Sequence, residues 1–202
     1  ADDAALPSWI SIDSSTGIIS GTPANGDVGD IAVKVTATDG DSASVSDTYT
    51  LTVVNTNDAA IISGSTTGAV TEDSETTTAT GTLTHTDVDV DNSDNVFTAV
   101  TDVTSTYGSY SVTTAGVWTY TLDNTNSATD ALSALAPAID TITVMAEDGT
   151  PKDVMITITG VNDAPVITSS ATVSAPENGT AAMTVIATDA ESSSIAYSIS
   201  GT

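Results

Sequence analysis

Apolar and polar residues alternate in three stretches of the chain, at residues 31–38, 49–53 and 154–159. Many of the apolar positions carry β-branched Val or Ile. A period of two with β-branched side chains predicts strands that bury one face and expose the other. Residues 127–135, between two of these stretches, are compatible with a single helical turn.

Two short motifs predict tight turns that follow such strands. The sequence reads ATDGD at residues 37–41 and AEDGT at residues 146–150. An Asp-Gly pair between alternating segments favours a β-hairpin. Each hairpin is expected to join the last two strands of a domain.

The same set of marks occurs twice along the chain. Asn57 and Asn162 each begin an Asn-Asp-Ala triplet, so the repeat is 105 residues long. A Glu follows each triplet at the same distance, and an acidic pair follows each Glu after a Thr. These residues are Glu72 with Asp87 and Asp89, and Glu177 with Asp189 and Glu191. Such self-similarity indicates a tandem array.

The repeat divides the chain into one whole unit and two halves. Residues 59–163 form the complete unit, residues 1–58 the closing half of another, and residues 164–202 an opening half that ends in a predicted strand at 195–200. An isolated half-sandwich would leave strand edges unpaired. We therefore expect neighbouring copies to complete the halves, either within a longer chain or by head-to-tail strand complementation.

Several segments resemble bacterial surface domains. Residues 6–23, LPSWISIDSSTGIISGTP, resemble the closing half of a dystroglycan-type cadherin-like domain, and residues 175–199 resemble the opening of a cadherin-type domain. Residues 81–92 and 107–126 resemble a VCBS repeat. The resemblance implies an all-β fold of tandem Greek-key, Ig-like (cadherin-like) β-sandwiches joined by short calcium-binding linkers. It also implies an extracellular or cell-surface adhesin.

The resemblance places calcium ligands at two junctions. The predicted ligands of the first are Asn55, Asn57, Asp58, Asp87, Asp89 and Asp148, with Glu177 reaching Asp58 in the rejoined domain. Those of the second are Glu72, Asn162, Asp163, Asp189 and Glu191, with Asp39 from the closing half. Carboxylate and carbonyl oxygens on loops are what Ca²⁺ prefers. The alternative is that these Asp and Asn residues only form solvated turns.

The sequence also departs from the cadherin pattern. Glu191 stands where the second acidic residue is usually Asp, and Asp27 and Asp30 stand roughly where an Asp-Arg-Glu motif is expected. The linkers hold fewer acidic and Asn positions than a full cadherin linker. Fewer ions per junction are therefore expected.

The charge of the chain limits which molecules it can bind. The formal net charge is -25, from 27 Asp and Glu against 2 Lys and Arg. This charge would repel nucleic acid and favours bound cations or high salt. The sequence has no cysteine for a disulfide and no apolar run of membrane-spanning length, so no membrane insertion is expected.

The predicted function is a structural, calcium-rigidified spacer of an adhesin or filament, and not an enzyme. The lone His85 is expected to be an exposed strand residue, and Trp118, Tyr120 and Leu122 share one strand face that predicts core. The alternative function is a calcium-dependent module that binds polysaccharide or protein. Retention on insoluble polysaccharide would separate the two.

Overall fold

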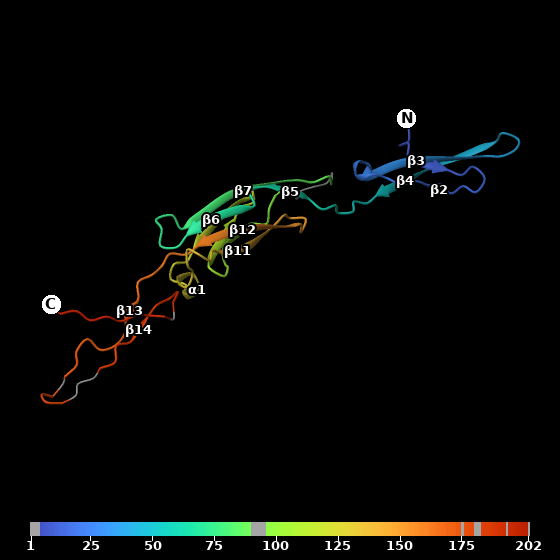
Figure 1. The fold of residues 1–202 in the computed structure, drawn as a ribbon. Helices are drawn as coiled ribbons and strands as arrows, with labels where there is room; N and C mark the ends of the chain where they lie inside the picture. The colour runs from blue at the N-terminus through green and yellow to red at the C-terminus, as the bar shows by residue number, and fades with distance from the viewer. Residues whose placement is uncertain (1–4, 90–95, 175, 180–182, 193, 202) are drawn as a thin grey trace. The chain divides into compact units, whose positions relative to one another are not determined.

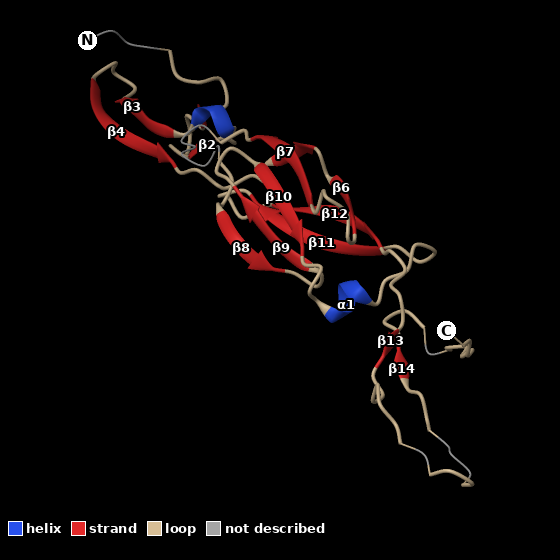
Figure 2. Cartoon of the chain, turned by 90° about the vertical axis from the view of Figure 1, so that its left-hand side faces the viewer, coloured by secondary structure: helices blue, strands red, loops and turns tan. Residues whose placement is uncertain are grey.

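The computed structural model describes residues 5–89, 96–174, 176–179, 183–192 and 194–201. The described residues form two compact units, one of residues 5–61 and 86–89, the other of residues 62–85 and 96–201. Strands predominate in both (Figures 1 and 2). The all-β prediction is confirmed, with one four-residue α-helix, α1 (Ser127–Asp130), in the described part of the chain.

The second unit contains a β-sandwich built from two sheets. The larger sheet has the order β5-β7-β10-β9-β8 and the smaller has the order β11-β12-β6. The strands of the larger sheet are β5 (Ile61–Gly64), β7 (Thr78–Thr86), β8 (Val100–Thr104), β9 (Gly108–Val112) and β10 (Val117–Leu122). Those of the smaller are β6 (Thr67–Thr71), β11 (Ala138–Met145) and β12 (Pro151–Thr159).

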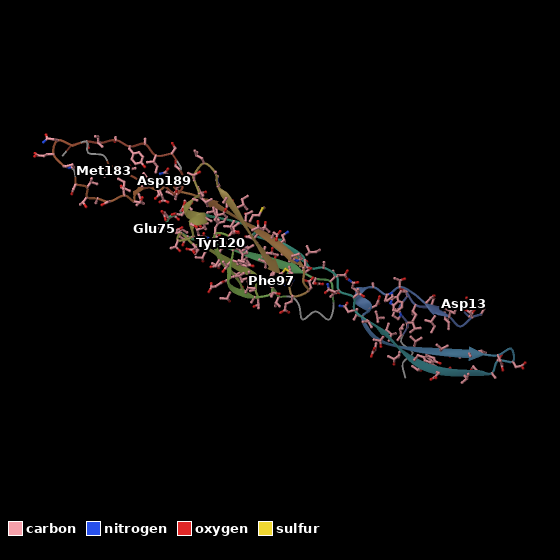
Figure 3. The ribbon with its side chains drawn as sticks, turned by 90° about the horizontal axis from the view of Figure 1, so that it is seen from below. Asp13, Glu75, Phe97, Tyr120, Met183 and Asp189 are labelled. Carbon is pink, nitrogen blue, oxygen red and sulfur yellow. The ribbon has the colours of Figure 1, made fainter. Side chains whose placement is uncertain are left out.

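The core lies between these sheets and follows the predicted alternation. Trp118, Tyr120 and Leu122 of β10 are buried, as the shared strand face predicts. The opposing sheet contributes six further buried apolar side chains, which are Val70, Ile142, Val144, Val154, Ile156 and Ile158. Figure 3 labels Tyr120 and Phe97, both buried in this sandwich.

The Trp118 indole leaves room only for glycine at two positions of the neighbouring strands. Its Nε1 donates a hydrogen bond to the Ser65 carbonyl at 2.8 Å. A Cβ added at Gly81 would lie 2.5 Å from the indole, and one added at Gly68 would lie 2.9 Å from it. Only glycine lets the two strands approach the ring this closely.

A parallel pair joins the first part of the sandwich to its last strand. β6 pairs with β12 from Thr67 opposite Met155 to Thr71 opposite Thr159. Met155 N donates to the Thr66 carbonyl, and Glu72 N donates to the Thr159 carbonyl. The even-numbered residues of β6 therefore form the ladder with β12, because alternate residues of a strand point their N–H to opposite edges.

The first unit is built around one long hairpin. β3 (Gly29–Thr38) pairs antiparallel with β4 (Ser44–Val53), around the turn that ATDGD predicts. A short pair, β1 (Ser11–Ile12) with β2 (Ile19–Ser20), and a 3₁₀ turn, η1 (Asn25–Asp27), complete it. Among its described residues up to β4, Val33 is the one buried large apolar side chain.

The C-terminal segment of the second unit has little regular structure. Two short strands, β13 (Val166–Ile167) and β14 (Ala187–Thr188), pair antiparallel. The predicted strand at 195–200 is wrong, because the structure assigns no strand to residues 194–201. An alternating segment forms a strand only when a neighbouring strand takes up its backbone hydrogen bonds.

His85 also differs from its expected exposed position. Its ring is half-buried and meets the Phe97 ring edge-on, with the centroids 4.9 Å apart. Packing against a buried aromatic ring is a structural role for this residue. Among the described residues, none of the helices has the length and hydropathy of a membrane span.

Candidate metal centres

Three carboxylates converge at the exit of the sandwich. Glu72, Asp130 and Asp163 each offer a carboxylate oxygen, and these oxygens lie within 4.8 Å of one another. Glu72 directly follows β6 and is only 2% exposed. Its Oε2 accepts a hydrogen bond from the Val161 N–H at 2.9 Å, which fixes the carboxylate against the linker that follows β12.

Helix α1 brings Asp130 into this cluster. The Asn126 side chain caps the helix by accepting from Ala128 N at 2.9 Å, and its amide donates to the Thr106 carbonyl. Thr129 is fully buried and its hydroxyl donates to the Tyr107 carbonyl. Asp130 is thus attached to the sandwich by its neighbours and not by its own side chain.

The cluster opposes its own ionisation. Burial raises the pKa of the Glu72 carboxyl, and the nearby carboxylates of Asp163, Asp73 and Asp130 raise it further, against the hydrogen bond from Val161. Burial likewise raises the pKa of Asp163, with Glu191 as the next cause. A cation at this position would relieve both effects.

One carboxylate oxygen of the cluster and one beside it lack a protein donor. Asp163 N donates to Glu191 Oε1 at 3.3 Å, while Asp163 Oδ2 and Glu191 Oε2 are buried with no hydrogen-bond partner. A buried, unsatisfied carboxylate oxygen is costly unless a cation or water meets it. An open hollow of about 430 Å³ adjoins these groups and is lined by Asp130, Asp163 and Asp189. It has room for an ion with its water ligands.

The first junction repeats this arrangement within the first unit. Asp58 N donates to Asp89 Oδ2 at 3.0 Å, and Asp89 N donates to Asp87 Oδ1 at 2.9 Å. Asp89 Oδ1 is buried without a partner. The Asn25 amide donates to Asp58 Oδ2 at 2.6 Å from the 3₁₀ turn of the first unit.

The two linkers therefore share one local geometry. In each, the linker Asp donates its N–H to the second residue of the acidic pair, whether that residue is Asp89 or Glu191. In each, the preceding Asn donates its side-chain amide to the carbonyl of the linker Asp, at 2.9 Å from Asn57 and 2.7 Å from Asn162. The replacement of Asp by Glu at position 191 leaves this contact in place.

The other four predicted ligands lie in hairpin turns, in an exposed segment or beside a hollow. Asp39 Oδ1 accepts from the N–H groups of Asp41 and Ala43, and Asp148 Oδ1 accepts from Thr150 N, so both close their own hairpin turns. Glu177 is exposed. Asn55 lines a hollow beside Asp58. Coordination by these four residues stays a prediction.

Two residues near the junctions were missed from the sequence. Asp130 lies in a loop between β10 and β11, and Asn25 lies before β3, so neither belongs to a repeated mark. The signal available for Asp130 was the segment compatible with a helical turn, with Asn126 before it as a capping residue. For Asn25 we find no comparable signal.

The sandwich and its acidic linkers place the chain in the class of all-β, Ig-like or cadherin-like domains. Residues 57–160 match the family model of the bacterial cadherin-like domain, and residues 1–54 match that of a putative Ig domain. The first match spans more than half of the chain, and the chain belongs to the bacterial cadherin-like family. The closer resemblance of the middle unit to a VCBS repeat stays a prediction.

Two of the solved structures to which the chain is similar are of protocadherins. The protocadherin γB4 extracellular domain is 18% identical with a TM-score of 0.46, over 94% of this chain and 31% of that one. Extracellular cadherin domains 3–6 of protocadherin γB2 are 16% identical with a TM-score of 0.48, over 90% and 45%. The chain thus spans less than half the length of either. No curated protein matches it.

Proposed function

We propose that the chain is a calcium-stiffened spacer of an extracellular bacterial adhesin or filament. The observation that carries the proposal is the cluster of Glu72, Asp130 and Asp163. It combines one carboxylate from the body of the sandwich, one from α1 and one from the linker. A divalent cation bound to all three would tie the linker to the sandwich and resist bending there.

The chemistry of the cluster favours Ca²⁺ over transition metals. The convergent ligands are carboxylates, without the thiolate or imidazole groups that Zn²⁺ and Cu²⁺ prefer. The exposed Asp130 and the adjoining hollow leave positions for water. Extracellular calcium modules bind with a Kd of about 10⁻⁴ to 10⁻³ M, so the site would fill outside the cell and not in the cytosol.

The test compares two glutamates that lie close together in the sequence. Glu72→Gln removes the buried carboxylate, while Glu75→Gln makes the same chemical change at an exposed position (Figure 3). In 10 mM Ca²⁺, a site with a Kd of about 1 mM would stabilise the sandwich by about 1.4 kcal/mol. We expect EDTA to lower the melting temperature of the sandwich in the wild type and in Glu75→Gln, but not in Glu72→Gln.

A bending measurement completes the test. Small-angle scattering of the wild type should show a shorter maximum dimension in EDTA, because clustered carboxylates without a cation repel one another. The absence of any calcium effect on both melting and scattering would sink the proposal. Binding to polysaccharide, the other interpretation of the sequence, predicts retention on an insoluble glycan.

A further inference from the structure

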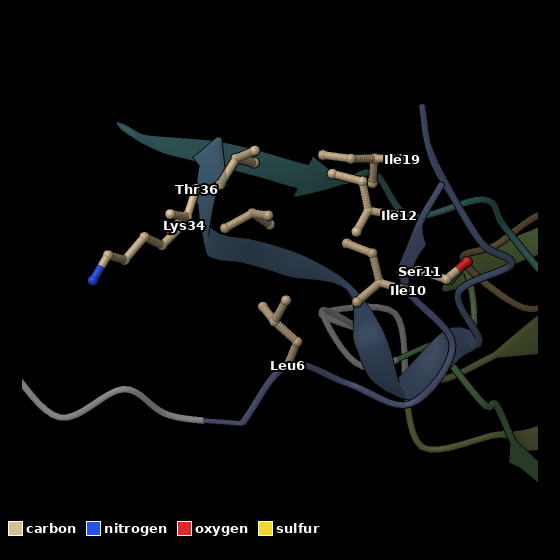
Figure 4. Close-up of a pocket in the computed structure, with 9 residues that line it drawn as sticks. Leu6, Ile10, Ser11, Ile12, Ile19, Lys34 and Thr36 are labelled. Atoms are coloured by element: carbon tan, nitrogen blue, oxygen red, sulfur yellow. The ribbon is translucent and has the colours of Figure 1, made fainter. Parts of the chain in front are cut away.

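The first unit exposes an apolar groove on its long hairpin. Leu6, Ile10, Ile12, Ile19, Val33 and Val35 line an open hollow of about 340 Å³ (Figure 4). On the neighbouring strand, Tyr49 is 56% exposed. Side chains of this kind are normally covered in a folded sandwich.

The C-terminal segment exposes apolar side chains of the same kind. Tyr197 is 57% exposed and Ile199 is fully exposed, and Val173 is 54% exposed. The two surfaces belong to the opening and closing halves of one repeat. Neither is covered within its own unit in the described residues.

The complete sandwich shows how such halves fit together. Positions one repeat of 105 residues apart correspond to one another. Met155, Ile156 and Thr157 of β12 therefore correspond to Thr50, Leu51 and Thr52 of β4. By the same spacing, Thr67, Gly68 and Ala69 of β6 correspond to Thr172, Val173 and Ser174, which come 105 residues later. In the complete unit these two sets form a parallel ladder. The corresponding edge of β4 carries no strand among the described residues.

Two residues of the C-terminal segment suit this ladder. Pro176 falls at the position of Thr71, an odd-numbered residue whose N–H points away from β12, so a proline there breaks no ladder hydrogen bond. Glu177 falls at the position of Glu72, whose carboxylate accepts the N–H of Val161. The equivalent donor is the N–H of Thr56.

We propose that residues 172–174 of a second copy of this chain, with Pro176 and Glu177 after them, add as a parallel strand to the edge of β4 that carries no strand among the described residues. The register pairs Thr50 with Thr172 and Leu51 with Val173, and the Glu177 carboxylate accepts from Thr56 N of the first copy. Further along the second copy, the exposed side chains of Tyr197 and Ile199 then cover the groove beside Val33. Repetition of the contact joins copies head to tail.

The exposed apolar surface is large enough for such an interface. The large apolar side chains on the two halves that are more than a third exposed are Leu6, Ile12, Ile18, Ile19, Val45, Tyr49, Val54, Val166, Ile167, Val173, Met183, Val185, Ile186, Tyr197 and Ile199. At about 100 Å² each, and with a third of them left uncovered, they still supply on the order of 1,000 Å². That area is what a specific interface requires.

Cross-linking between single-cysteine variants tests the register, because the chain has no cysteine of its own. Thr50→Cys and Thr172→Cys are mixed as full-length chains that differ in mass, oxidised in Ca²⁺, and run on a non-reducing gel. Paired strands hold the two thiols at an effective concentration near the millimolar range. We expect at least about tenfold more mixed dimer than from random collision at 0.1 mM.

Two controls use the same thiol on Thr50. Thr78→Cys replaces an exposed threonine on β7 of the complete sandwich, and Val173→Cys shifts the register by one residue to the opposite strand face. Both should give only the background yield. Equal yields from Thr172→Cys and Thr78→Cys would overturn the proposal. The proposal does not rest on calcium, so a negative calcium titration leaves it standing.

Discussion

The chain holds two hairpins with the same alternation of apolar and polar positions, and they differ in burial. In the complete sandwich, Val154, Ile156 and Ile158 of β12 are wholly buried. One repeat earlier, β4 carries Tyr49, Leu51 and Val53 with the same alternation, yet Tyr49 is 56% exposed. Both hairpins form the same antiparallel pairing. The difference teaches that local pattern suffices for the hairpin, while a core requires the facing sheet.

The largest expected contrast comes from truncating the same repeat position in both hairpins. Ile156→Ala should cost about 2–5 kcal/mol, because it removes fully buried methyl groups and leaves a cavity beneath Trp118. Leu51→Ala, at the equivalent half-buried position, should cost about 1 kcal/mol or less in the dilute chain. Urea unfolding, followed by resolved amide signals of each unit, measures both.

Measuring the unfolding free energies of the same two variants at high chain concentration tests whether a second copy covers β4. If a second copy covers β4, the cost of Leu51→Ala should grow with chain concentration, while that of Ile156→Ala should not. Equal costs for the two variants in dilute solution would contradict the difference in burial.

A smaller effect is expected from the polar group inside the complete sandwich. The Tyr120 hydroxyl donates to Asp140 Oδ2 at 2.8 Å, and Tyr107 N donates to the same oxygen at 3.2 Å. Burial raises the pKa of Tyr120, and the bond to Asp140 raises it further, so the phenol stays protonated. Tyr120→Phe would leave the buried carboxylate with one fewer donor and should cost about 1–3 kcal/mol.

The matched control for that change lies on the other hairpin. Tyr49→Phe removes a hydroxyl from a largely exposed ring. Its effect on the unfolding free energy should stay within about 0.5 kcal/mol, as for most surface changes. Equal effects of the two substitutions would show that Asp140 does not depend on Tyr120.

The smallest predicted effect is a pH dependence in EDTA. Since the pKa of Glu72 is raised in the folded chain above its usual 4.5, the folded state binds protons at a pH where the unfolded state has released them. Stability of the sandwich should therefore rise as the pH falls from 7 toward 5. Thermal melting in EDTA measures this rise, Glu72→Gln should reduce it, and Glu75→Gln should not.

Much of the fold could be read from the sequence. The alternation at residues 31–38, 49–53 and 154–159 gave the strands β3, β4 and β12, and Asp-Gly gave both hairpin turns. The segment at 195–200 has a similar alternation but no strand in the structure. A strand needs a partner for its N–H and C=O groups, and a pattern within one segment does not reveal whether a partner is present.

The candidate metal site also contains residues that the sequence indicated and one residue that only the structure reveals. The resemblance to cadherin domains grouped Glu72, Asp163 and Glu191 at one junction, and in the second unit Glu72 and Asp163 share one carboxylate cluster while Asp163 N donates to Glu191. Asp130 carries no repeated mark, because it reaches the cluster through the anchoring of α1 at Thr129. Position in three dimensions, and not spacing along the chain, selects it.

By itself, the sequence determined the strands β3, β4 and β12, both hairpin turns, the repeat and the acidic linkers, because these depend on residues near one another or on motifs that recur. The tertiary structure decided that β11 and β12 face a second sheet across a core. It also brought Asp130 to Glu72. Burial and charge clustering are set by segments far apart in the chain, so they depend on packing that no single segment contains.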